Sequence, residues 1–116
     1  MRKICVLGLG YVGLPLSVEL ASKNQVIGYD IKQNRINELN KGYDSTNELT
    51  SNKVTEHSNK SIIYTNDENK LTKADFYIVT VPTPINKDKT PNLMPLIKAS
   101  KTVSKHLRKD DIVVYE

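Results

Sequence analysis

The sequence lacks features on which several large classes of protein depend. It has a single cysteine, Cys5, so no disulfide can form within the chain, which fits a reducing compartment. No apolar stretch approaches the length of about 18 residues that a membrane-spanning helix needs. The apolar run behind the basic amino terminus reaches a glycine after only four residues, too early for a signal peptide. These absences predict a cytoplasmic protein without a membrane partner.

The chain also lacks the patterns that accompany nucleic-acid and metal binding. Its 17 basic residues exceed its 13 acidic ones, and a net charge of +4 can accompany nucleic-acid binding. The lysines are, however, spread from Lys3 to Lys109 among acids, with neither a basic stripe nor an aromatic platform for base stacking. Histidine, cysteine and aspartate do not cluster with metal-ligand spacing. We therefore expect a solvated surface, no nucleic-acid partner and no metal.

The sequence does contain a regular alternation of short apolar runs and helical segments. Strands are predicted at residues 4–7, 25–29, 61–65, 75–81 and 111–115, and helices at 11–22, 35–40 and 93–107. A further helix is expected to run through His57, with Ser45 or Asn47 as its cap. This alternation predicts one α/β domain over residues 1–116, with a parallel sheet and helices on both faces. The expected strand order is 3-2-1-4-5, with a ligand beside the first strand.

Three glycines, Gly8, Gly10 and Gly13, form the pattern GxGxxG between the first predicted strand and the first helix. The first glycine permits a tight turn, the second lets a pyrophosphate approach the backbone, and the third lets the helix pack closely on the sheet. The helix amino terminus then presents free N–H groups to the phosphates. The alternative is a glycine-rich turn without a ligand, but three glycines at this spacing sacrifice helix propensity for no other visible gain.

An acidic residue, Asp30, ends the second predicted strand, 17 residues after Gly13. A carboxylate there accepts hydrogen bonds from both hydroxyls of an adenosine ribose and repels a 2′-phosphate, which favours NAD over NADP. Lys32 and Arg35 complicate this prediction, because either could meet a 2′-phosphate, and Arg35 could also flank the adenine. The alternative for Arg35 is a solvated charge on a helix. NAD remains favoured because Asp30, at the strand end, is nearer the ribose hydroxyls.

A second loop, Val81-Pro82-Thr83-Pro84, follows the fourth predicted strand. Loops at the carboxyl ends of parallel strands face the ligand. The two prolines fix this backbone and leave Thr83 as the polar group able to touch a cofactor. The alternative is a rigid turn that Thr83 only caps.

Together these motifs resemble those of one family. The segments GLGYVGLPLS, GYD and VPTP, at residues 8–17, 28–30 and 81–84, resemble the Rossmann-type NAD-binding domain of the UDP-glucose/GDP-mannose dehydrogenase family, and the similarity covers the whole chain. Two further segments, GYDSTNE at 42–48 and residues 84–100, which contain PNLMPLIKAS, are similar to one branch of that family. This branch comprises the bacterial UDP-N-acetylhexosamine 6-dehydrogenases, which make uronic acids for capsule and O-antigen polysaccharides.

The resemblance implies a two-step oxidation that turns the 6-hydroxyl of a UDP-sugar, in this branch a UDP-N-acetylhexosamine, into a carboxylate with two NAD. It assigns cofactor contact to the glycine loop, with the backbone of Tyr11 and Val12 on the pyrophosphate. It assigns Asp30 and Arg35 to the adenosine end and Thr83 to the second loop. It also implies a homodimer whose sugar-binding domains lie outside this chain, so the residues present do not select the sugar.

The catalytic groups that the resemblance implies are not among these residues. The family uses a cysteine thiol and a lysine much further along a longer chain, whereas Cys5 lies in a predicted strand where a small buried hydrophobe is expected. His57 and His106 are isolated histidines for which we expect surface positions. Glu116 resembles the glutamate of a Glu-Ser-Thr segment of the family. The chain is therefore expected to be a fragment that is inactive by itself.

Two alternatives remain open at this point. A stand-alone nucleotide-sensing module of the potassium-transport type shares the strand, GxGxxG loop, helix, strand and aspartate within a similar length, and it binds its ligand without chemistry. Another dehydrogenase with a related amino-terminal half, of the hydroxyacid or phosphogluconate type, is the second. The VPTP loop and the PNLMPL segment favour the nucleotide-sugar dehydrogenase over both.

Overall fold

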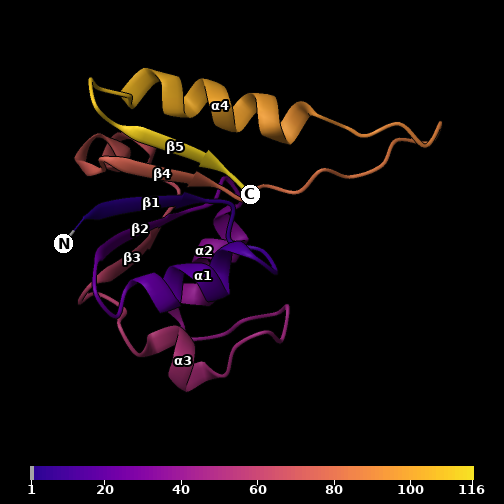
Figure 1. Ribbon diagram of the computed structural model, residues 1–116. Coiled ribbons are helices and arrows are strands. Elements are labelled where there is room, and N and C mark those ends of the chain that lie inside the picture. The colour runs from indigo at the N-terminus through magenta and orange to yellow at the C-terminus, as the bar shows by residue number, and fades with distance from the viewer. Residues whose placement is uncertain (1) are drawn as a thin grey trace.

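The computed structural model describes residues 2–116, whose five strands form one parallel sheet with helices on both faces (Figure 1). In chain order the elements are β1 (Lys3–Leu7), α1 (Gly13–Leu20), β2 (Gln25–Tyr29), α2 (Gln33–Asn40), α3 (Ser51–Thr55), β3 (Ile62–Thr65), the 3₁₀ helix η1 (Glu68–Lys73), β4 (Phe76–Val79), α4 (Met94–His106) and β5 (Ile112–Tyr115). The strand order is β3-β2-β1-β4-β5. The predicted fold class, strand order and helices on both faces are confirmed.

The hydrophobic core lies on both faces of the central strand β1, because successive side chains of a strand point to opposite faces. Ile4 and Val6 pack in one cluster with buried residues of α1, α2 and α3. Cys5 and Leu7 pack in the other cluster with buried residues of η1 and α4. Burial on both faces explains why this strand is a continuous apolar run rather than an alternating one.

The strand register brings three loops to the same edge of the sheet. Leu7, at the end of β1, lies opposite Tyr29 of β2 on one side and Val79 of β4 on the other. The Gly8 N–H donates to Tyr29 O at 2.8 Å, and the Thr80 N–H donates to Leu7 O at 2.8 Å, so the pairing continues just past the strand ends. The glycine loop, Asp30 and the loop after β4 therefore open together at the carboxyl edge, where parallel sheets bind ligands.

The predicted capping of the helix in the polar segment before β3 is wrong. Helix α3 ends before His57, and its cap is Thr50, whose hydroxyl accepts a hydrogen bond from the Lys53 N–H at 3.3 Å. Ser45 and Asn47 lie in the preceding loop, where Asn47 has a φ of 58°, a left-handed conformation typical of turns. Helix η1 was also not foreseen, because six residues are too few to display a helical apolar period.

Candidate cofactor site

The turn after β1 is held tightly against the end of β4. Gly8 has a φ of 97°, which L side chains rarely adopt, and a Cβ atom there would lie 2.9 Å from the backbone nitrogen of Val81. The Thr80 hydroxyl donates to the carbonyl oxygens of Leu7 and Gly8, at 3.1 and 2.7 Å. Thr80 was not among the predicted site residues, although a polar residue at the end of an apolar strand was an available signal. Thr80 ties the glycine loop to the neighbouring strand.

The other two glycines of the loop have opposite surroundings. A Cβ atom on Gly13 would lie only 1.7 Å from Gly8 O and 2.4 Å from the Thr80 hydroxyl oxygen, so the start of α1 packs directly on the turn. A Cβ atom on Gly10 would meet no atom within 4 Å. The open side of Gly10 is the kind of space that a pyrophosphate needs in order to approach a backbone.

Backbone donors accompany this open space at the start of α1. Within residues 2–116, the first N–H after Gly10 that donates to the backbone is that of Leu14, which bonds to Gly10 O at 3.2 Å. The N–H groups of Tyr11 and Val12 have no such acceptor, and the side chains of both residues are exposed. Free N–H groups at the amino terminus of a helix bind anions, aided by the positive end of the helix dipole.

Asp30 is anchored to the glycine loop from the end of β2. Its Oδ2 atom accepts a hydrogen bond from the Leu9 N–H at 2.9 Å, and its Oδ1 atom accepts one from the Lys32 N–H at 3.0 Å. The carboxylate is half-buried. Because a carboxylate offers about four acceptor positions, lone pairs remain for the two hydroxyls of a ribose.

Arg35 of α2 converges on the same residue of the glycine loop. Its Nε donates to Leu9 O at 2.7 Å, while Nη1 donates to Glu38 Oε1 at 2.6 Å and to Asp44 Oδ1 at 2.9 Å. Only 9% of the side chain is exposed, so the alternative of a solvated helix charge is wrong. Burial disfavours the charged guanidinium, but the hydrogen bonds to the two carboxylates outweigh it and raise the pKa of Arg35.

One nitrogen of this guanidinium, Nη2, is buried without a hydrogen-bond partner. Buried donors in folded proteins are almost always paired, so an unpaired one marks a strained or functional position. Asp30 and Arg35 both bond to the backbone of Leu9, the first to its N–H group and the second to its carbonyl oxygen. This arrangement fits the adenosine ribose of a dinucleotide.

Asp44, which was not predicted as a site residue, holds the segment after α2 in place. Gly42, with a φ of 84°, ends the helix and turns the chain back. The fully buried Asp44 carboxylate then accepts hydrogen bonds from the N–H and hydroxyl of Thr46 and from the N–H groups of Glu48 and Leu49, at 2.6 to 3.0 Å. Burial opposes its ionisation, but these bonds and that from Arg35 prevail and hold the pKa of Asp44 at about 2.

The lowered pKa of Asp44 predicts a loss of stability in acid. Because the pKa is lower in the folded than in the unfolded chain, the carboxylate stabilises the fold above about pH 4, and this contribution disappears as the pH falls towards 2. The free energy of unfolding should lose on the order of 2 kcal/mol over this window from Asp44. Urea unfolding at several pH values measures the loss, which should shrink in Asp44→Asn. An unchanged acid slope in that variant would contradict the assignment.

Thr83 lies apart from these residues, on the segment that joins β4 to α4. This segment extends away from the sheet (Figure 1), and Thr83 is exposed. A hydrogen bond from the Asn86 N–H to Thr90 O, at 2.8 Å, closes its tip. The structure therefore brings Thr83 to the correct edge of the sheet without contacts that fix it beside the glycine loop, and its role stays a prediction.

The cysteine and the two histidines of the sequence lie outside the cofactor site. Cys5 is fully buried in β1, as expected, and burial raises the pKa of its thiol, so it does not supply a thiolate nucleophile. The surface position expected for His106 is wrong, because only 10% of its side chain is exposed where α4 packs against η1, with its Nε2 4.0 Å from Glu68 Oε2. His57 is 25% exposed beside Glu56. Within residues 2–116 the acids, histidines and cysteine form no group able to hold a metal ion.

Comparison with known proteins identifies the family. The model of the UDP-glucose/GDP-mannose dehydrogenase family, NAD binding domain, matches residues 2–116. The chain belongs to this family. Protein CapL of Staphylococcus aureus is 54% identical over 115 residues, and UDP-N-acetyl-D-glucosamine 6-dehydrogenase of Pseudomonas aeruginosa is 51% identical over 114 residues. A solved UDP-D-ManNAc dehydrogenase from Pyrococcus horikoshii superposes with a TM-score of 0.91 at 32% identity and covers 98% of this chain.

Membership of the UDP-glucose/GDP-mannose dehydrogenase family confirms the resemblance and NAD as the cofactor. No comparison supports the potassium-transport alternative. The alignments with the two relatives cover 99% and 98% of this chain but only 26% of each relative, and this chain covers 28% of the solved structure. The chain thus spans about a quarter of the length of the relatives it matches. Within residues 2–116 no helix is both long and apolar enough to pass through a membrane.

Proposed function

We propose that the chain is the NAD-binding domain, residues 1–116, of an oxidoreductase that converts the 6-hydroxyl of a UDP-sugar to a carboxylate with two NAD. The substrate class inferred is a UDP-N-acetylhexosamine, because 6-dehydrogenases of UDP-N-acetyl-D-glucosamine are 51% and 49% identical to this chain. These relatives extend far beyond the matched region, which leaves room for the central and sugar-binding domains. The sugar is selected there rather than in residues 1–116.

The convergence of Asp30 and Arg35 on Leu9 is the observation that carries the cofactor assignment. It combines anchored acceptors with an unpaired buried donor at the edge of the sheet where the glycine loop is open. When bound, NAD supplies the acceptor for the hydride that leaves the sugar in each oxidation. In this proposal Asp30 accepts hydrogen bonds from the ribose hydroxyls, and Arg35 donates one through Nη2.

The glycine loop binds the other half of the adenosine diphosphate in this proposal. Gly8 and Gly13 set the turn, Gly10 leaves the backbone accessible, and the N–H groups of Tyr11 and Val12 donate to the pyrophosphate. Thr83 borders the nicotinamide side. No residue of this chain is proposed as catalytic, because the inferred chemistry on the sugar needs groups from the rest of the protein.

We further infer that the longer protein is a cytoplasmic homodimer that serves the synthesis of capsule or O-antigen polysaccharide. The support is the family membership and the identity of 54% to protein CapL. The proposed binding partner is the UDP-sugar substrate. The proposal includes no nucleic acid, metal ion or membrane.

Titration calorimetry of the full chain with NAD and NADP tests the cofactor assignment. We expect saturable binding of NAD and at least about tenfold weaker binding of NADP, a difference of about 1.4 kcal/mol, because a 2′-phosphate would approach the Asp30 carboxylate. Circular dichroism of the same sample provides the control for folding. A folded sample that prefers NADP, or that binds neither dinucleotide, would overturn the proposal.

A further inference from the structure

The position of Arg35 bears on whether the adenosine end of the site prefers NAD or NADP. An arginine near the ribose is the usual means by which this fold accommodates the 2′-phosphate of NADP. Asp30, on the same residue of the glycine loop, favours the free hydroxyl of NAD instead. Which cofactor wins therefore depends on the groups that surround the guanidinium.

The two carboxylates beside Arg35 carry more negative charge than the positive charge of its guanidinium. Glu38 Oε1 lies 2.6 Å and Asp44 Oδ1 lies 2.9 Å from its Nη1, and the side chains of the two acids are 22% and 0% exposed. One buried positive charge therefore faces two negative charges. Lys32, the nearest other cation in sequence, is exposed at the start of α2, where water and salt weaken its field.

The hydrogen bonds also remove the geometry that a phosphate requires. An arginine binds phosphate through two parallel N–H bonds from neighbouring nitrogens of its planar fork. In Arg35, Nε is committed to Leu9 O and Nη1 to the two carboxylates, so Nη2 is left alone. The one nitrogen that remains has no free neighbouring nitrogen with which to form the paired contact that a phosphate takes.

Both acids are held so that they cannot swing away from the guanidinium. The Ser45 hydroxyl donates to Glu38 Oε1 at 2.7 Å, and the N–H groups of Thr46, Glu48 and Leu49 hold the Asp44 carboxylate. The turn at Gly42 sets this geometry, since the Tyr43 N–H closes back on Glu38 O at 2.9 Å. The acids are therefore fixed parts of the site.

Resting on the proposed function, we propose that Glu38 and Asp44 determine the choice of NAD over NADP by occupying Arg35. Neither acid needs to touch the cofactor. Each acts through the guanidinium, by cancelling its charge and by taking the nitrogen that a 2′-phosphate would need. The segment from Gly42 to Leu49 thereby becomes part of the cofactor specificity of this chain.

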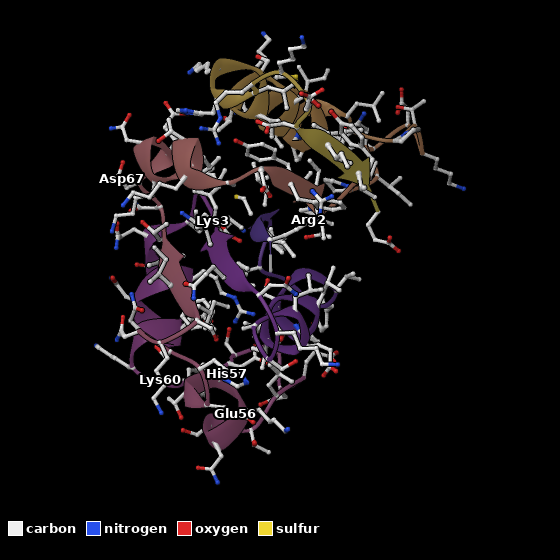
Figure 2. All side chains as sticks on the ribbon, turned by 60° about the vertical axis from the view of Figure 1, so that its left-hand side comes forward. Arg2, Lys3, Glu56, His57, Lys60 and Asp67 are labelled. Atoms are coloured by element: carbon white, nitrogen blue, oxygen red, sulfur yellow. The ribbon has the colours of Figure 1, made fainter. Side chains whose placement is uncertain are left out.

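The test compares NAD and NADP affinities of the full chain with those of Glu38→Gln, Asp44→Asn and the double variant. Removal of each negative charge should raise the affinity for NADP relative to NAD, by about tenfold in the double variant. Glu56→Gln is the matched control: it removes an exposed acid beside His57, at the end of the molecule opposite α4 (Figure 2), and should leave the ratio unchanged. A merely structural role for the acids would weaken both cofactors equally.

The single variant Glu38→Gln keeps the result interpretable if Asp44→Asn does not fold. Glu38→Gln keeps an acceptor for Ser45 on a partly exposed side chain and should still shift the ratio. An unchanged ratio in folded Glu38→Gln would overturn this inference alone. Failure of the unmodified chain to bind either dinucleotide would overturn the proposed function as well.

Discussion

Gly10→Val should abolish NAD binding while leaving the fold intact. The new side chain would fill the open space in front of the loop and keep a pyrophosphate from the N–H groups of Tyr11 and Val12. We expect the affinity for NAD to fall by at least about a hundredfold, or about 2.7 kcal/mol. Because a Cβ atom on Gly10 meets nothing within 4 Å, the free energy of unfolding should change by no more than about 0.5 kcal/mol.

Calorimetry gives the binding change, and urea unfolding of the same variant gives the stability. Ser22→Val, which places the same side chain at an exposed site just past the other end of α1, serves as the control and should bind NAD normally. Retention of near-normal NAD affinity in Gly10→Val would show that the pyrophosphate does not sit on this loop.

Gly13→Ala should have its largest effect on stability rather than on binding chemistry. The added carbon would lie 1.7 Å from Gly8 O, a backbone atom that cannot rotate away. Alanine gains about 1 kcal/mol of helix propensity over glycine, but a steric collision of this kind costs about 3 kcal/mol or more and prevails. We expect the free energy of unfolding to fall by about 2 kcal/mol or more, with the turn and the helix start forced apart.

Thermal and urea unfolding measure this loss, and Gly10→Ala is the matched control. The same chemical change three residues earlier meets open space, so it should leave the stability nearly unchanged. Equal stability of the two variants would mean that α1 does not pack on the turn as closely as the structure shows.

The parts of the site that the sequence predicted are those that depend on local order along the chain. A buried apolar run ends at Gly8, and another ends at Asp30, so strand positions alone place both at one edge of a parallel sheet. The burial of Cys5 follows from the same run. Such features need only the chain direction and the two faces of a strand.

The environment of Arg35 could not be predicted in this way. Its partner Asp44 is nine residues away, and the two meet only because Gly42 reverses the chain after α2. The burial of His106 similarly depends on α4 packing against η1, an element that shows no periodic pattern in the sequence. In both cases the burial depends on a segment outside the helix that carries the side chain, so no local pattern indicated it.

The sequence by itself determined the α/β fold, the strand order, the glycine loop and the position of Asp30 at the end of β2, because each follows from the pattern of apolar runs and from residues adjacent to strand ends. Only the tertiary structure decided that Gly13 packs on Gly8, that Thr80 ties the loop to β4, and that Arg35 is buried between Glu38 and Asp44. The physical reason is that these contacts and ion pairs join residues of different elements. The distances between such residues are set only once the elements have packed.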